Sequence, residues 1–335
     1  PNQLVTDYIA KSEYTYDTSD PAYSQVINIL YENMKAENQI AKKEVETTAK
    51  PVETTVKNNE KNNNKKKKNK AIVPMPKKSG KLYTEKNIGS FKEVINRFYT
   101  VTNATTIKES DMPIKQALNK EFKITGNNKK PQILIYHTHS MEDFSNTTKD
   151  EDTTIIGVGN RLAQILREQF GYNVIHDKTK YDIVNGKLDR HEAYTQSKAG
   201  VKKQLKKYPS ISLILDIHRD GVNDGTRLVT EINGKKTAQI MFFNGMSRFK
   251  LSGDIDYLKN PYRFENLALG LQMKVNAECY YPGFTRRNYV NAYEYNLSLG
   301  KQCMLIEVGA QTNTYQEAKN AAEPLAVLIK KVLGE

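Results

Sequence analysis

The sequence predicts an α/β domain with three layers, α/β/α, built on a mixed, mainly parallel β-sheet. Two observations carry this prediction: apolar runs of strand length recur along the chain, and helix-like segments separate them. Continuous apolar runs are typical of strands buried on both faces, and their alternation with helices favours parallel strand pairs. The first apolar run begins at residue 132, and the three later runs span 212–218, 238–245 and 303–309. The helix-like segments span 158–170, 191–208, 264–279 and 314–333.

The helical segments and one hairpin are recognised by their spacing. Apolar residues recur every three or four positions in the first helical segment, as on the buried stripe of an amphipathic helix, at Val158, Leu162, Ile165 and Leu166. Residues 229–232 and 237–243 flank Asn233-Gly234-Lys235-Lys236, and Asn-Gly is a strong hairpin signal. The hairpin predicts an antiparallel addition to the sheet, which is why a mixed sheet is expected.

Composition divides the chain into four parts. Residues 1–34 form a Tyr-rich segment with a helix-start signal, and residues 35–80 form a basic linker whose near lack of apolar side chains is typical of disorder. Residues 81–130 hold two amphipathic segments that are expected to pack against the domain that follows. That domain, residues 131–335, contains all the apolar runs and is the predicted catalytic domain.

The formal charge of +13 suggests an anionic partner. Much of the excess lies in residues 41–80, which hold twelve Lys and four Glu. This segment is interpreted as a solvated tether, or as a tether that also adheres to anionic wall polymers or lipid headgroups. Nucleic acid is not an expected partner, because no reader motif occurs and the basic run lacks interleaved aromatic residues.

The two cysteines and the hydropathy of the chain exclude other classes. Cys279 and Cys303 are too few for a disulfide scaffold and lack zinc-finger spacing, so both are expected to be structural. No run of eighteen apolar residues occurs, which argues against a transmembrane helix in this chain. Because the chain begins at Pro1 rather than at methionine, an export signal or membrane anchor is expected to precede it in the full-length protein.

Polar side chains stand at the ends of the apolar runs. In an open α/β sheet, ligands bind beyond the carboxyl ends of the strands. Five side chains are therefore expected to converge on one site: His137, His139, His218, Asn244 and Glu307. Imidazole and carboxylate are ligand types of a catalytic zinc ion, which keeps one coordination position open for water.

The first strand runs directly into His137 and His139. Period-2 geometry places both on one side of an extended segment, with His139 favoured as the ligand and His137 as its supporting neighbour or the alternative ligand. Glu142 is interpreted as the third ligand or as a loop residue, and His218 as a ligand or a hydrogen-bonded structural histidine. Asp216, two residues before His218, is expected to accept a hydrogen bond that orients an imidazole.

Glu307 lies inside an apolar strand, where an unpaired charge is costly. Burial should raise its pKa and suit it to general acid/base work on a water molecule, and the alternative is a structural ion pair with Arg219. Arg190, Arg219 and Asn244 are candidates for substrate binding, the two arginines through a substrate carboxylate. His176 is expected to be structural.

Taken together, these residues resemble the stage II sporulation protein P family. The motifs that carry the resemblance occur in order and are Ile135-Tyr136-His137-Thr138-His139-Ser140-x-Glu142, Asp189-Arg190-x-x-Ala193-Tyr194, Leu215-Asp216-Ile217-His218-Arg219-Asp220, Tyr281-Pro282-Gly283, Leu305-Ile306-Glu307-Val308-Gly309 and Glu317-Ala318-x-x-Ala321-Ala322. The resemblance spans residues 83–335 and leaves out the segment before them. Unlike the broader zinc amidases, this chain places a carboxylate only three residues after the first histidine ligand.

The resemblance implies a zinc-dependent N-acetylmuramoyl-L-alanine amidase of forespore engulfment. It implies Zn²⁺ as the cofactor, His139, Glu142 and His218 as its ligands, and Glu307 as the catalytic glutamate. The implied substrate is the bond between N-acetylmuramic acid and L-alanine in peptidoglycan, with endopeptidase activity on cross-linked stem peptides. The implied setting is extracytoplasmic: a protein anchored in the mother-cell membrane, facing the septal or forespore wall, beside a lytic transglycosylase partner.

Two other functions fit the same residues. One is a different zinc peptidase, carboxypeptidase-like, that acts on free peptides. The other is a wall-binding protein without activity on an amidase-like fold. The intact set of His139, Glu142, His218 and Glu307 argues against the second, because degenerate enzymes usually lose at least one such group.

Overall fold

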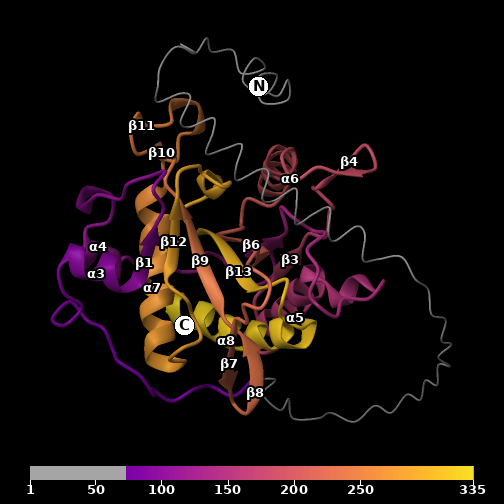
Figure 1. The fold of residues 1–335 in the computed structure, drawn as a ribbon, viewed down its shortest axis with the longest axis horizontal. Helices are drawn as coiled ribbons and strands as arrows, with labels where there is room; N and C mark the ends of the chain where they lie inside the picture. The colour runs from indigo at the N-terminus through magenta and orange to yellow at the C-terminus, as the bar shows by residue number, and fades with distance from the viewer. Residues whose placement is uncertain (1–72, 335) are drawn as a thin grey trace. The chain divides into compact units, whose positions relative to one another are not determined.

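The computed structural model describes residues 73–334 of the chain (Figure 1). The helix expected within residues 1–34 and the linker up to residue 72 lie outside this range. Residues 73–80, which the composition assigns to the linker, contact the domain: Val73 is buried, and its backbone N–H donates to Gln169 Oε1 at 2.6 Å. None of the helices within 73–334 has the length and apolar character needed to cross a membrane.

A seven-stranded sheet forms the centre of the domain, with its strands in the order β1-β12-β9-β13-β6-β2-β3 (Figure 1). Strands β13, β6, β2 and β3 run parallel to one another, and β9, β12 and β1 form a second parallel group. The two groups meet where β9 pairs antiparallel with β13. The predicted mixed, mainly parallel sheet is therefore confirmed, and its strands are β1 Tyr99–Val101, β2 Ile133–Tyr136, β3 Val174–His176, β6 Leu213–Asp220, β9 Ile240–Gly245, β12 Asn288–Asn291 and β13 Cys303–Ala310.

Helices cover both faces of this sheet, which confirms the predicted three layers. One face contributes to the larger hydrophobic core with α5, α7 and α8, and the other contributes to a smaller core with α6. Strands buried from both sides account for the continuous apolar runs in the sequence. All four helices predicted from apolar spacing are present with slightly different ends: α5 Ile155–Glu168, α6 Ala193–Lys207, α7 Arg263–Tyr280 and α8 Tyr315–Val332.

Local sequence determines where the helices around the sheet begin. Thr314 precedes α8 and forms a capping box with Glu317, in which each side chain accepts from the other residue's backbone N–H. Thr154 caps α5 in a simpler way, because its hydroxyl accepts from the backbone N–H of Ile156. These caps fix the points at which the chain leaves the loops beside the sheet and enters the helical layer.

Residues 81–130 join the same core as the sheet. Their two helices, α3 Phe91–Phe98 and α4 Ile114–Asn119, bury side chains such as Val94 and Ala117. Strand β1 follows α3 directly and pairs with β12, so this part of the chain supplies one edge of the sheet.

The predicted hairpin is present as β7 Val229–Ile232 and β8 Lys235–Ala238, which pair antiparallel. Its turn has two residues rather than four: Asn233 and Gly234 have φ of 51° and 73°, as a type I′ turn requires. The hairpin is a separate two-stranded sheet, and the antiparallel part of the main sheet begins at β9, whose residues 240–243 lie in the predicted second arm. Two more short hairpins and four 3-10 turns complete the structure: β4 Ile183–Val184 with β5 Lys187–Leu188, β10 Arg248–Phe249 with β11 Gly253–Asp254, η1 Glu109–Asp111, η2 Glu151–Thr153, η3 Asp256–Leu258 and η4 Leu297–Leu299.

Candidate metal centre

The chain bends directly after β2, so the segment that carries His137 and His139 is not an extended strand. The strand ends at Tyr136, and Thr138 is bound by Asp216 on β6: its backbone N–H donates to Oδ1 at 2.9 Å and its hydroxyl to Oδ2 at 2.6 Å. The chain bends at residues 138 and 139, so His137 and His139 do not lie on one extended segment, and that expectation is wrong. The two histidines have different neighbours.

Asp182 fixes the next part of this loop. Its buried carboxylate accepts hydrogen bonds from the hydroxyl of Ser140 and, at 2.9 Å, from the backbone N–H of Met141. Farther along, the backbone N–H of Ile155 donates to the carbonyl of Glu142 at 3.1 Å, which ties the loop to the start of α5. Asp182 stands in no apolar run and next to no other candidate, so sequence reasoning did not identify it.

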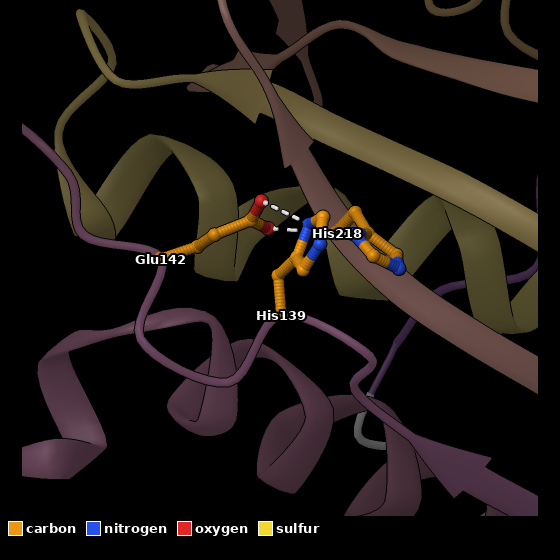
Figure 2. Close-up of side chains that lie close together, drawn as sticks. All are labelled: His139, Glu142 and His218. Carbon is orange, nitrogen blue, oxygen red and sulfur yellow. Dashed lines mark ion pairs between the residues drawn. The ribbon is translucent and has the colours of Figure 1, made fainter. Parts of the chain in front are cut away.

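His139, Glu142 and His218 meet in a buried cluster (Figure 2). Glu142 faces both imidazoles: its Oε1 lies 3.4 Å from His139 Nδ1, and its Oε2 lies 3.7 Å from His218 Nδ1. One ligand atom from each of the three residues lies within 4.8 Å of the others. Two imidazole nitrogens and a carboxylate oxygen are a donor set that fits a catalytic zinc ion with one open position.

The charges in this cluster favour a cation. Burial alone would raise the pKa of Glu142, but hydrogen bonds from His139 and His218, the charge of His218 and the nearby Arg190 hold it well below its usual range. Burial alone would lower the pKa of His218, yet Asp216 and Glu142 raise it well above the usual range. The two carboxylates therefore stabilise a positive charge at His218, as a proton or as a metal ion that replaces the proton.

Asp216 lies against the His218 ring, where a supporting carboxylate was expected. Its Oδ1 lies 2.9 Å from His218 Nε2, which leaves Nδ1 directed toward Glu142. Burial would raise the pKa of Asp216, but the His218 charge and hydrogen bonds from His218 and Thr138 lower it. A carboxylate on the far nitrogen of a metal-binding imidazole fixes its tautomer and makes it a stronger ligand.

Glu307 lies beside this cluster because of strand register. Residue 307 on β13 is the direct partner of His218 on β6, and a bulge follows between residues 307 and 310. Gly309 occupies the bulge with φ of 66°, a conformation that favours glycine. Burial raises the pKa of Glu307 to about 8. Its Oε2 atom is buried and makes no hydrogen bond within residues 73–334.

His137 contacts the backbone of β6 and His176 rather than the other candidate ligands. Its Nδ1 donates to the carbonyl of Ile217 at 2.7 Å, and its Nε2 lies 2.8 Å from Nε2 of His176. Burial lowers the pKa of His137 to about 4 and that of His176 to about 2. A Cβ at Gly159 would lie 2.7 Å and 2.6 Å from those two Nε2 atoms, so only glycine leaves room for the pair. Both nitrogens of His137 are thus engaged, which favours His139 as the ligand.

The two arginines lie next to Glu142. The backbone N–H of Arg219 donates to Glu142 Oε2 at 2.8 Å, and its side-chain Nε donates to the carbonyl of Asp143 at 2.9 Å. Arg219 therefore holds the loop that carries Glu142. Arg190 Nη1 lies 3.4 Å from Glu142 Oε1, on the segment that leads into α6.

Asn244 is not part of the site, so that prediction is wrong. Because β9 runs antiparallel to β13, its carboxyl end lies at the opposite edge of the sheet from Glu307. Figure 1 shows this reversal, because hairpin β7–β8, which follows β6, and hairpin β10–β11, which follows β9, lie at opposite ends of the sheet. Asn244 is buried and donates to the carbonyl of Tyr289 at 3.3 Å.

The fold and the cluster define an α/β protein with a candidate two-histidine, one-glutamate metal centre. A family model described as Stage II sporulation protein P matches residues 8–330, and the chain belongs to that family. This confirms the resemblance, and the match also includes the segment before residue 83 that the motifs left out.

A curated relative and two solved structures are similar to this chain. Stage II sporulation protein P of Bacillus subtilis (strain 168) is 27% identical over 213 residues, which cover 59% of this chain and 50% of the relative, so the chain spans about half the length of that protein. The N-acetylmuramyl-L-alanine amidase Ami1 from Mycobacterium smegmatis is 12% identical with a TM-score of 0.39, covering 62% of this chain and 99% of that one. An N-acetylmuramoyl-L-alanine amidase from Clostridium difficile 630 is 14% identical with a TM-score of 0.34, at 62% and 99% coverage.

Proposed function

We propose that this protein is a zinc-dependent peptidoglycan hydrolase that cleaves the amide bond between N-acetylmuramic acid and L-alanine. The observation that carries the proposal is the register pairing of Glu307 with His218, which sets a half-buried acid beside the three candidate ligands. A metal-binding cluster next to an unpaired carboxyl group is an arrangement suited to hydrolysis of an amide. Membership of a sporulation family supports a substrate in the cell wall.

His139, Glu142 and His218 are the residues that would hold Zn²⁺. When bound, such an ion acts as a Lewis acid toward the scissile carbonyl and makes water more acidic. Asp216 holds the His218 ring in position, and the Arg219 backbone holds Glu142. Both contacts come from β6, a strand that is paired on both sides within the sheet.

Glu307 is the proposed general base and acid. It removes a proton from the attacking water and delivers it to the nitrogen of the leaving amine. Its pKa of about 8, set mainly by burial, means that the carboxyl group is mostly protonated at neutral pH, although the charges of His218 and Arg219 act to lower that pKa. A positive charge in the adjacent cluster favours the ionised form that a base requires.

Arg190 is proposed to bind a carboxylate of the stem peptide, because its guanidinium stands at the edge of the cluster beside Glu142. Arg219 is proposed to act mainly on Glu142, since its backbone and side chain are both used on the loop. The peptide side of the substrate would then lie toward the segment that leads into α6.

For the whole protein we propose endopeptidase activity on cross-linked stem peptides as well. We also propose that it works outside the cytoplasm during engulfment, anchored in the mother-cell membrane and facing the septal or forespore wall. A lytic transglycosylase that opens the glycan strands is the proposed partner. These proposals follow the family membership.

The test is mass spectrometry of the fragments that the protein releases from purified peptidoglycan. Free stem peptides should appear with zinc and disappear with a chelator or in Glu307→Gln. Glu231→Gln is the matched control, because Glu231 is an exposed residue of hairpin β7–β8. Shortened cross-links without sugar–peptide cleavage would replace the amidase with a peptidase, and binding to the wall without any release would contradict catalysis.

A further inference from the structure

The sheet face that carries Glu307 also carries aromatic side chains. Glu307 and Leu305 lie two residues apart on β13, so their side chains share a face. Leu305 pairs in register with Phe243 of β9, and Phe243 pairs with Tyr289 of β12. Both rings are half-buried, in contrast to Leu305, which is fully covered.

These rings connect to the candidate metal site through a continuous series of ring contacts. Tyr194 packs edge-to-face on His139 at 5.5 Å between ring centroids, and Tyr295 packs on Tyr194 at 5.7 Å. Phe243 lies 4.6 Å from Tyr295, and Tyr289 lies 5.2 Å from Phe243. We call Tyr194, Tyr295, Phe243 and Tyr289 the aromatic row. The row extends from His139 to β9 and β12, the strands on one side of β13 in the sheet order.

The row is uncharged and has polar groups along it. The Asn291 side chain donates to the Tyr295 hydroxyl at 2.7 Å. The cation near Tyr289 is the Arg286 guanidinium, which is ion-paired with Asp220. Aromatic side chains that combine an apolar ring with a polar tip suit a ligand with an apolar face and a hydroxyl rim, as a pyranose ring has.

The arginine beside Tyr289 already has a partner. A carboxylate placed against Tyr289 would lose its hydration beside the Arg286 guanidinium, which is already ion-paired with Asp220, and this loss is costly. In the sheet order, β9 and β12, which carry Phe243 and Tyr289, lie on one side of β13, and β6, which carries His218, lies on the other.

The geometry points to the aromatic row as the subsite for a neutral sugar residue of the glycan strand. This inference rests on the proposed function, in which the scissile amide joins a saccharide to a carboxylate-bearing peptide. The saccharide then lies along Phe243 and Tyr289, beside the candidate ligands and Glu307.

The test is binding of a β-1,4-linked tetramer of N-acetylglucosamine, measured by titration calorimetry with the zinc-loaded protein. Tyr289→Leu and Phe243→Leu should each weaken binding about fivefold or more, because each removes an aromatic contact. Tyr289→Phe should bind as the unaltered protein does, since it keeps the ring. Tyr83→Leu is the control: Tyr83 is also half-buried and packs edge-to-face on Phe98, away from the row.

Three results would overturn the inference: no binding of the tetramer at millimolar concentration, binding that is equal in all variants, or a loss in Tyr289→Leu of binding to a sugar-free stem peptide instead. The tetramer contains no amide that the enzyme is proposed to cut, so binding is measured apart from catalysis. Ring-dependent binding without release of stem peptides from peptidoglycan would contradict the proposed function alone. Release of stem peptides without ring-dependent binding would contradict this inference alone.

Discussion

Glu307 on β13 and His218 on β6 are register partners in adjacent parallel strands, and both side chains are directed to the same face of the sheet. His218 carries a raised pKa because Asp216 and Glu142 stabilise its positive charge, whereas burial raises the pKa of Glu307 to about 8. The pair thus places a group that favours positive charge next to a carboxyl group that retains its proton near neutral pH. Strand pairing alone brings these two environments together.

Removing the acid of Glu307 should separate catalysis from metal binding. Glu307→Gln keeps the volume of the side chain and touches no candidate ligand atom, so zinc content should remain that of the unaltered protein. Turnover should fall about 100-fold or more, the usual effect of losing a general base. Zinc by elemental analysis and fragment release by mass spectrometry check both parts, and His218→Ala should lose zinc and turnover together. Activity retained in Glu307→Gln would remove its assigned role.

Asp216→Asn should weaken zinc binding about 10- to 100-fold, because it removes the carboxylate that orients His218. A chelator competition measures this affinity. Asp177→Asn is the matched control: Asp177 is a buried carboxylate just after β3 that binds Thr179 and Tyr181 and makes no contact with the cluster. Equal affinity in Asp216→Asn and Asp177→Asn would show that Asp216 has no role in orienting the ligand.

Zinc affinity should rise with pH through and above neutrality. The raised pKa of His218 means that its imidazole holds a proton at pH 7, and a metal ion must displace that proton to bind. Glu142 has a lowered pKa and stays ionised over the same range. The dissociation constant should therefore fall about tenfold per pH unit while one proton is displaced, and then level off above the pKa of His218. Affinity that is constant between pH 6 and pH 9 would contradict this account.

Gly309→Ala should destabilise the fold more than Gly234→Ala. Both glycines have positive φ, so both substitutions incur backbone strain of about 1–2 kcal/mol. A Cβ at Gly309 would also lie 2.8 Å from Asn313 Oδ1 and 2.9 Å from Ala238 Cβ, whereas a Cβ at Gly234 meets nothing within 4 Å. Urea unfolding of both variants measures the difference, and equal losses would mean that the bulge accommodates a methyl group.

Much of the fold was predictable because each element has a local cause. Helices such as α5 follow from apolar residues at helical spacing, and the buried strands follow from continuous apolar runs. The direction of β9 was not predictable in this way. A run buried on both faces looks the same whether it pairs parallel or antiparallel, and this is why Asn244 was assigned to the wrong edge.

The candidate site was predictable in its residue types and less so in its contacts. His139, Glu142 and His218 stand at strand ends in the sequence, and the structure brings them together. Between His137 and His139 the chain bends at Thr138, whose backbone N–H donates to Asp216, 78 residues away along the chain. The pairing of His137 with His176 depends on the space left by Gly159 on a neighbouring helix. Such long-range contacts leave no periodic signal in the sequence.

The strands that carry the cluster come from distant parts of the chain, with His139 after β2, His218 on β6 and Glu307 on β13. No two of these strands are neighbours in sequence, so the candidate metal site and Glu307 come together only after β6 has paired on both sides. Under the proposed function, a chain whose last strand has not docked would therefore be inactive. Completion of the sheet would then prevent a partly folded hydrolase from cleaving the wall of the cell that makes it.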